Sequence, residues 1–146
     1  MVMEVVKVRP LRSEDIPSAM KIQQKITGKS AKEGWKREIE TRSKENPKEC
    51  LVAVYADRVV GFIIGEVKTL EYGVERSGWI VMVGVDPEFM GQGIGKKLGR
   101  SLLNHFKKKR IKQVFTSVPW DSSDLLAFFK SLGFERSEFI NLERRL

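Results

Sequence analysis

Apolar residues fill the stretch from Trp79 to Val85, and most of them are β-branched. Such a run predicts a buried strand. Asp86 and Pro87 end it, because proline has no N–H to donate to a neighbouring strand. After a stretch with glycines at 91, 93 and 95, apolar residues recur at helical spacing; they are Ile94, Leu98, Leu102 and Phe106. The pattern therefore predicts a strand, a glycine-rich turn and an amphipathic helix, in that order.

The rest of the chain alternates in the same way between strand-like and helix-like patterns. Strands are expected at 4–9, 50–55, 59–68 and 112–118, helices at 14–25, 31–45 and 122–132, and one or two further strands within 134–143. The polar segment 69–77 is expected to be a turn. The resulting order, β-α-α-β-β-β-α-β-α-β, predicts a mixed α/β fold, and a length of 146 residues suits a single domain over residues 1–146.

Composition narrows the class of protein. The chain is 41% hydrophobic, but no apolar run approaches the length needed to cross a bilayer, which is about 20 residues. Cys50 is the only cysteine and His105 the only histidine. A single cysteine excludes an internal disulfide and a cysteine zinc site, and a single histidine argues against a histidine metal site. We expect a cytoplasmic protein without a metal, in which Cys50 is a buried, unreactive side chain.

A net charge of +8 is compatible with a nucleic acid, an acidic membrane surface or a polyanionic small molecule as partner. A nucleic-acid-binding domain would gather its lysines on one face with exposed aromatic residues between them. Here the basic residues are scattered over many elements. The run 107–110 is the exception, and four cations there also suit the C-terminal end of the preceding helix dipole. Nucleic acid is therefore the weaker interpretation.

The three alternating glycines predict an anion-binding loop. Gly91, Gly93 and Gly95 lie between a strand and the start of a helix. Glycines let the backbone come close to a ligand, and the first N–H groups of the helix attract a negative charge. Lys96 and Lys97 follow in the first turn, where cations oppose the helix dipole unless a phosphate compensates them. The sequence thus predicts a pyrophosphate-binding loop.

Two other glycine loops fit poorly. The Walker loop needs glycine where this chain has Met90, and serine or threonine where it has Lys97. The dinucleotide loop needs its third glycine three residues after the second, whereas Gly95 follows Gly93 by two. It also needs a carboxylate near position 115, which is a phenylalanine.

A better match is the stretch V-x-V-x-P-E-F-M-G-Q-G-I-G-x-x-L at 83–98. It resembles the acetyl-coenzyme A loop of the GNAT superfamily of N-acyltransferases. A second motif of that family is matched in part by S-S-D-L-L-A-F-F-K-S-L-G-F at 122–134. The resemblance covers nearly the whole chain. It implies a central mixed, mostly antiparallel sheet flanked by about four helices.

The resemblance also implies which residues bind acetyl-CoA. Main-chain groups of Val83, Gly84 and Val85 would hold the pantetheine arm. The pyrophosphate would be bound by the loop residues Met90, Gly91, Gln92, Gly93, Ile94, Gly95 and Lys96. Ser122 and Phe129 take the positions of the family's asparagine and tyrosine. Three residues depart from the family pattern: Met90 replaces an arginine or glutamine, Ser122 is a shorter donor, and Phe129 has no proton for the leaving thiolate.

No general base is evident from the sequence. Where family members place a glutamate or tyrosine this chain has Trp79, and where some place a histidine it has Ser117. Glu66 and Tyr72 are the first candidates for a base that acts through water, and Ser117 is a candidate for ordering a water. An ordinary surface or strand position is the alternative for each of them.

The resemblance implies an N-acetyltransferase that moves an acetyl group from acetyl-CoA to a primary amine by direct attack in a ternary complex. The acceptor would be a protein N-terminus, a lysine or a small amine, and a homodimer is a further expectation. Three alternatives stay open: a different acyl donor, a non-catalytic acyl-CoA-binding module, and a basic nucleic-acid-binding domain.

Overall fold

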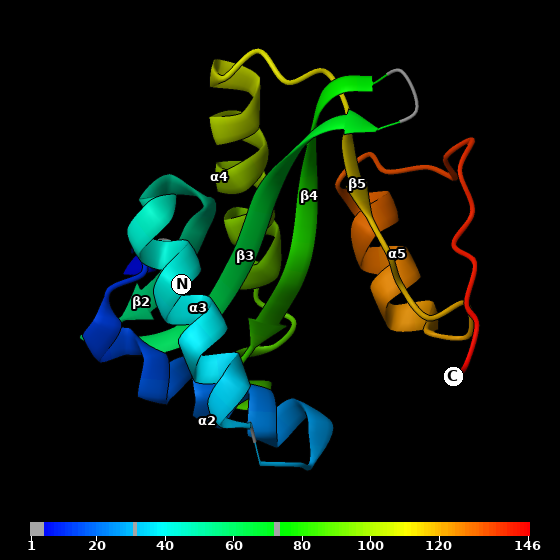
Figure 1. Cartoon of the computed structure of the whole chain (residues 1–146). Helices are drawn as coiled ribbons and strands as arrows, with labels where there is room; N and C mark the ends of the chain where they lie inside the picture. The colour runs from blue at the N-terminus through cyan, green and yellow to red at the C-terminus, as the bar shows by residue number, and fades with distance from the viewer. Residues whose placement is uncertain (1–4, 31, 72–73) are drawn as a thin grey trace.

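A computed structural model describes residues 5–30, 32–71 and 74–146. Its five-stranded sheet has the order β1 (Lys7–Pro10), β2 (Cys50–Tyr55), β3 (Arg58–Glu71), β4 (Val74–Val85) and β5 (Val114–Thr116) (Figure 1). The α-helices are α2 (Ile16–Thr27), α3 (Glu33–Glu45), α4 (Ile94–Lys108) and α5 (Ser123–Ser131). Short 3-10 helices cover Ser13–Asp15, Pro47–Glu49 and Pro87–Phe89. Neighbouring strands are antiparallel except β4 and β5, which are parallel. The mixed, mostly antiparallel sheet is as predicted.

Two apolar cores lie on opposite faces of the sheet, because successive strand residues point to opposite sides. On one face Ile63 and Ile80 pack with Leu98 of α4. On the other, Phe62 packs with residues of α2 and α3, among them Ile16. Figure 1 shows α2 and α3 on the side of the sheet opposite α4. Cys50 belongs to the second core, where burial raises the pKa of its thiol to about 11, which suits a packing role.

Two predicted elements are wrong. The segment 69–77 is not a turn, because β3 and β4 continue through most of it, with Lys68 paired to Ser77 and Thr69 to Arg76. The backbone ladder between the two strands continues there although most of the side chains are polar. The segment 134–143 contains no strand. Its Ile140 is 74% exposed, so this segment has no buried face of the kind that fixes a strand's register.

Glycines in β3 and β4 make room for one aromatic side chain of α4. Phe106 is 1% exposed and covers both Gly65 and Gly78. A β-carbon added at Gly78 would lie 2.8 Å from the Phe106 ring, and one at Gly65 would lie 3.1 Å from it. Both distances are tighter than an ordinary van der Waals contact. The close approach of α4 to the sheet therefore depends on these two glycines.

Two glycines one turn apart on α4 do the same for α5. A β-carbon at Gly95 would lie 3.0 Å from Phe128, and one at Gly99 would lie 2.6 Å from Leu132. Phe128 and Leu132 are themselves four positions apart, so they stack along one face of α5 and its end. Gly95, expected only as a member of the anion-binding loop, thus also has a packing role.

Candidate cofactor and acceptor site

Strands β4 and β5 run together for three residues and then part. The ladder pairs Gly78 with Val114, Trp79 with Phe115 and Ile80 with Thr116, while β4 continues to Val85. Val83, Gly84 and Val85 pair with β3 on one side, and β5 offers them no partner on the other. Backbone groups on an open strand edge can bind an extended ligand through its amides. The structure thus places these three predicted residues along one open edge.

A β-bulge in β4 lies where the two strands part. Ile64 pairs with Met82 and Gly65 with Ile80, so Val81 is an extra residue without a partner on β3. A bulge bends its strand and increases the local twist. Val81 is 44% exposed, which is unusual for valine in the middle of a sheet. The bulge directs the end of β4 away from the line of β5.

The glycine loop ends directly at the start of α4. Gly91 and Gly93 have φ values of 79° and 82°, in the left-handed region that favours glycine. The first hydrogen bond of the helix runs from Lys97 N–H to the Gly93 carbonyl, at 3.0 Å. The amides of Ile94, Gly95 and Lys96 therefore have no acceptor within the helix. They make the positive end of α4 suitable for an anion.

The two lysines of the first turn differ in placement. The Lys97 ammonium donates to the Val6 carbonyl, so this side chain extends to the N-terminal part of the chain. Lys96 is partly exposed beside the loop amides. Gln92 is exposed, and Met90, 53% exposed, brings no charge to the loop. Lys96 is thus the side-chain cation nearest in sequence to the free amides.

Asp86 braces the turn that leads into the loop, a role that the sequence analysis missed. Its side chain is 3% exposed and accepts hydrogen bonds from Lys25 Nζ at 3.2 Å and Arg58 Nη2 at 2.9 Å. It also accepts the backbone N–H of Glu88 at 3.1 Å. These bonds join the turn Pro87–Phe89 to α2 and β3. An aspartate directly before a proline often bonds its own turn, and this was the available signal.

Asp86 makes the stability of the protein pH-dependent. Burial alone would raise the pKa of its carboxyl, but the Glu88 amide, Lys25 and Arg58 outweigh burial and lower the pKa from its usual 3.8. The carboxylate thus stabilises the fold above the usual pKa. We expect this contribution to disappear as the pH falls through the lower folded pKa. Urea unfolding from pH 7 to pH 2.5 should show it.

Asp86→Asn is the control for this prediction. Its free energy of unfolding should be lower at pH 7 and should fall less between pH 5 and pH 2.5 than that of the natural protein. Asp15, whose pKa is also lowered, is present in both proteins and contributes equally to both slopes. Identical slopes for the two proteins would contradict the assignment to Asp86.

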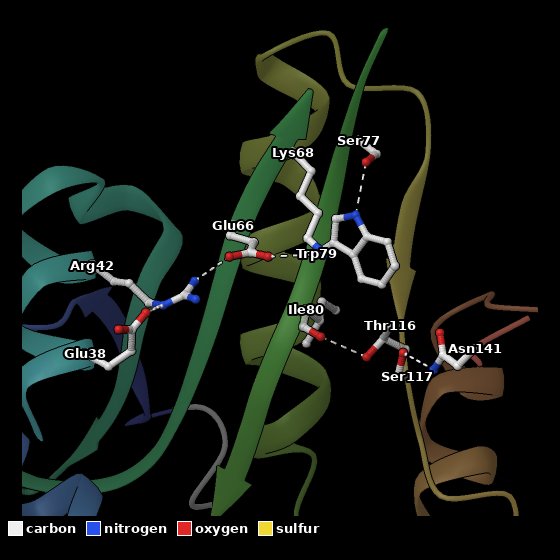
Figure 2. A network of polar contacts seen from close by, with 10 residues as sticks. All are labelled: Glu38, Arg42, Glu66, Lys68, Ser77, Trp79, Ile80, Thr116, Ser117 and Asn141. Carbon is white, nitrogen blue, oxygen red and sulfur yellow. Dashed lines mark hydrogen bonds and ion pairs between the residues drawn. The ribbon is translucent and has the colours of Figure 1, made fainter. Parts of the chain in front are cut away.

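Glu66 and Trp79 are cross-strand partners on the sheet face that α2 and α3 cover. Glu66 Oε2 lies 2.7 Å from Arg42 Nη1, and Glu66 Oε1 lies 3.7 Å from Lys68 Nζ. Arg42 in turn pairs with Glu38 at 2.7 Å. Figure 2 shows this chain of charges running from α3 to β3. Glu66 is therefore an ion-paired carboxylate with no oxygen free of a cation.

The Trp79 ring is held in one orientation. Its indole N–H donates to Ser77 Oγ at 3.0 Å, and Ser77 is 3% exposed. The Phe115 ring lies 5.3 Å away, centroid to centroid, on the adjacent strand. Lys68 Nζ lies 4.2 Å from the centroid of the Trp79 ring (Figure 2). This face thus combines an aromatic ring, a carboxylate and an ammonium from the chain itself.

Ser117 follows β5 where the strands part. Its hydroxyl accepts a hydrogen bond from Asn141 Nδ2 at 2.9 Å, and the neighbouring Thr116 donates to the Ile80 carbonyl at 2.9 Å. Ser117 therefore lies close to the divergence and is oriented by the C-terminal segment. Tyr72, the other predicted catalytic candidate, lies outside the described residues.

The second motif places Ser122 and Phe129 at α5. Ser122 precedes the helix and its side chain forms no capping bond. Phe129 is 6% exposed and belongs to the core between the sheet and α4, with Phe128 and Phe134 at ring distances of 5.1 and 5.3 Å. Phe129 thus packs α5 into this core and has no proton to transfer.

Metal binding and membrane insertion find no support in the described residues. Within residues 5–30, 32–71 and 74–146, no three His, Cys, Asp or Glu side chains are grouped to hold a metal ion. Over the same ranges, none of the helices has the length and apolar character to cross a membrane.

Curated proteins that share sequence with the chain include two acetyltransferases. Mycothiol acetyltransferase of Kocuria rhizophila is 36% identical over 103 residues, which are 68% of this chain and 34% of that protein. N-alpha-acetyltransferase 30 of Schizosaccharomyces pombe is 29% identical over 90 residues, which are 62% of this chain and 59% of that protein. The chain thus spans about a third of the first relative and under two thirds of the second.

Solved structures share the fold. Ard1 from Thermoplasma volcanium has a TM-score of 0.77 at 25% identity, over 91% of this chain and 84% of that one. Arabidopsis thaliana Naa50, solved with the bisubstrate analogue CoA-Ac-MVNAL, has a TM-score of 0.74 at 21% identity, over 97% and 93% of the two chains. The profile of the Acetyltransferase (GNAT) family matches residues 16–134. With the strand divergence and the glycine loop in place, the chain belongs to the acetyltransferase (GNAT) family.

Proposed function

We propose that this protein is an N-acetyltransferase that transfers the acetyl group of acetyl-CoA to a primary amine. The observation that carries the proposal is the pairing of two backbone features: the free amides at the start of α4 and the open edge of β4 at Val83–Val85. The first suits a pyrophosphate and the second suits an extended amide-bearing arm. CoA carries both groups in one molecule. The relatives with acetyltransferase names support the same reaction.

The residues of this chain would mainly position the two substrates. Acetyl-CoA supplies an activated thioester, and holding an amine next to it removes much of the entropic barrier to direct attack, a contribution worth about 7–11 kcal/mol in favourable cases. The loop amides would fix the pyrophosphate and β4 would fix the arm. The amine would approach from the face of Glu66 and Trp79, because Trp79 lies one residue before Ile80, the last residue of β4 that pairs with β5.

Proton transfer would be left mostly to water. Arg42 and Lys68 occupy both oxygens of Glu66, so this carboxylate acts as a fixed negative charge near the amine. The Ser117 hydroxyl can order a water at the divergence. The leaving thiolate would take its proton from solvent, because Phe129 has none to give.

Calorimetric titration with acetyl-CoA tests the proposal, with NADH and ATP as control ligands. We expect micromolar binding of acetyl-CoA alone, followed by amine-dependent release of free thiol when primary amines are added. Binding of none of the three ligands would contradict the proposal.

A non-catalytic acyl-CoA-binding module is the second candidate. It is favoured by one observation: the described site residues include neither an unpaired carboxylate next to Trp79 nor a proton donor at Phe129. The same experiment separates the two functions. A module would bind acetyl-CoA with the same affinity and release no thiol with any amine.

A further inference from the structure

The ammonium of Lys68 lies against the aromatic ring of Trp79 and the carboxylate of Glu66, on the sheet face from which the amine would approach. Its Nζ lies 4.2 Å from the centroid of the Trp79 ring and 3.7 Å from Glu66 Oε1. An ammonium over an indole face is attracted by the ring quadrupole, and a nearby carboxylate adds to that attraction. Trp79 and Glu66 therefore already form an ammonium-binding site, and the ammonium that occupies it is that of Lys68 on β3.

The walls of this site are fixed, while its occupant is held loosely. Trp79 is oriented by Ser77 and Phe115, and Glu66 Oε2 is fixed by Arg42 at 2.7 Å. In contrast, 3.7 Å between Lys68 Nζ and Glu66 Oε1 is longer than a hydrogen bond. The Lys68 side chain is 37% exposed and has a flexible four-carbon stem. It can leave the site without disturbing the walls.

We propose that Glu66 and Trp79 form the binding site for the ammonium of the acceptor, and that Lys68 occupies this site until the acceptor displaces it. The inference rests on the proposed function and names its substrate class. The occupant is a primary ammonium on an aliphatic stem, so the acceptor is an aliphatic primary ammonium such as a lysine side chain or an alkyl diamine. A hydroxyl or thiol acceptor would gain nothing from Glu66 or from the ring quadrupole.

The position of the site agrees with this role. Trp79 lies one residue before Ile80, where β4 and β5 part (Figure 2). On the adjacent strand, Phe115 lies one residue before Thr116. An amine bound over Trp79 thus lies next to the opening in which the open edge of β4 begins. Displacement of Lys68 by the acceptor places the amine there and returns the Lys68 ammonium to solvent.

Binding of n-butylammonium to Lys68→Met tests the proposal without any turnover. Methionine keeps the apolar stem and removes the charge. The probe is titrated into isotopically labelled protein while the Trp79 indole N–H signal is followed by NMR, with Trp79→Phe used to assign that signal. If Lys68 fills the site nine-tenths of the time, its removal strengthens binding on the order of tenfold. Neutral n-butanol should shift the signal in neither protein.

Three variants complete the design. Lys107→Met, at an exposed position on α4, should bind n-butylammonium as the natural protein does. Glu66→Gln in the Lys68→Met background should lose the added affinity. Lys68→Gln repeats the test if the methionine variant folds poorly. Equal affinity of the natural protein and both Lys68 variants would overturn the proposal, as would equal binding of n-butanol.

Calorimetry with acetyl-CoA on the same samples distinguishes the two proposals. If acetyl-CoA binds and Lys68→Met gains no affinity for n-butylammonium, the ammonium site is wrong and the proposed function stands. If n-butylammonium binds as expected and acetyl-CoA does not, the site stands and the proposed function is wrong.

Discussion

Gly93→Val is expected to weaken acetyl-CoA binding by at least about a hundredfold. Gly93 has a φ of 82° and directly precedes the free amides of α4, so a branched side chain strains the backbone that presents those amides to a ligand. Hydrogen bonds to a charged group contribute about 1.5–3 kcal/mol each. Loss of two of them corresponds to about 3–6 kcal/mol, or roughly a hundredfold to ten-thousandfold in affinity.

Gly28→Val is the matched control for this variant. Gly28 also has a left-handed backbone, with a φ of 72°, and it ends α2. Among the described residues, no atom outside its chain neighbours and its own helix lies within 4 Å of where its β-carbon would be. Valine there imposes similar backbone strain without approaching the loop. Calorimetry should show near-natural affinity for Gly28→Val. Similar losses in both variants would mean that strain alone, and not the loop amides, explains the effect.

Phe106→Ala is expected to lower the free energy of unfolding by about 3–5 kcal/mol, as is usual for the loss of a buried phenyl ring. Phe106 fills the space over Gly65 and Gly78, and neither glycine has a side chain that could close the resulting cavity. The cavity is therefore expected to persist, which places the cost at the upper end of that range. Equilibrium unfolding in urea measures it.

The neighbouring exposed Lys107→Ala serves as the control, with an expected change within about 0.5 kcal/mol. A loss below about 1 kcal/mol in Phe106→Ala would show that α4 moves inward to fill the space. In that case the close fit over Gly65 and Gly78 would not be a main source of stability.

Local patterns were sufficient to predict the strand, loop and helix that make up the proposed cofactor site. The run Trp79–Val85, the glycines after it and the helical spacing from Ile94 all act within a few residues of one another. Strand alternation, positive φ and helix amphipathicity depend on residues within a short window, so they can be predicted directly from the sequence pattern. The structure shows the predicted strand at 79–85 as the second part of β4, and the loop and α4 follow it as predicted.

Long-range contacts set the sheet face of Glu66 and Trp79, and no local sequence pattern predicts these contacts. Glu66 meets Arg42 across 24 positions of sequence. Its cross-strand partner is Trp79 only because of the exact register of β3 and β4, including the bulge at Val81. A shift of one residue would send Glu66 to the other face of the sheet. For the same reason the brace formed by Asp86 could not be derived from its position before Pro87 alone.

Gly95 belongs to the glycine loop and also packs against α5, so the three glycines are not equally good evidence for cofactor binding. Gly91 lies in open space, so nothing in the fold except its backbone angle requires glycine there. Gly95 lies against Phe128, and the seating of α5 requires it whether or not a nucleotide ever binds. In a related protein that no longer bound a cofactor, Gly91 would be free to mutate. Gly95 would be retained, because folding alone requires it. A glycine found only at the position of Gly95 would therefore indicate the packing of α4 against α5, and it would not be evidence of catalysis.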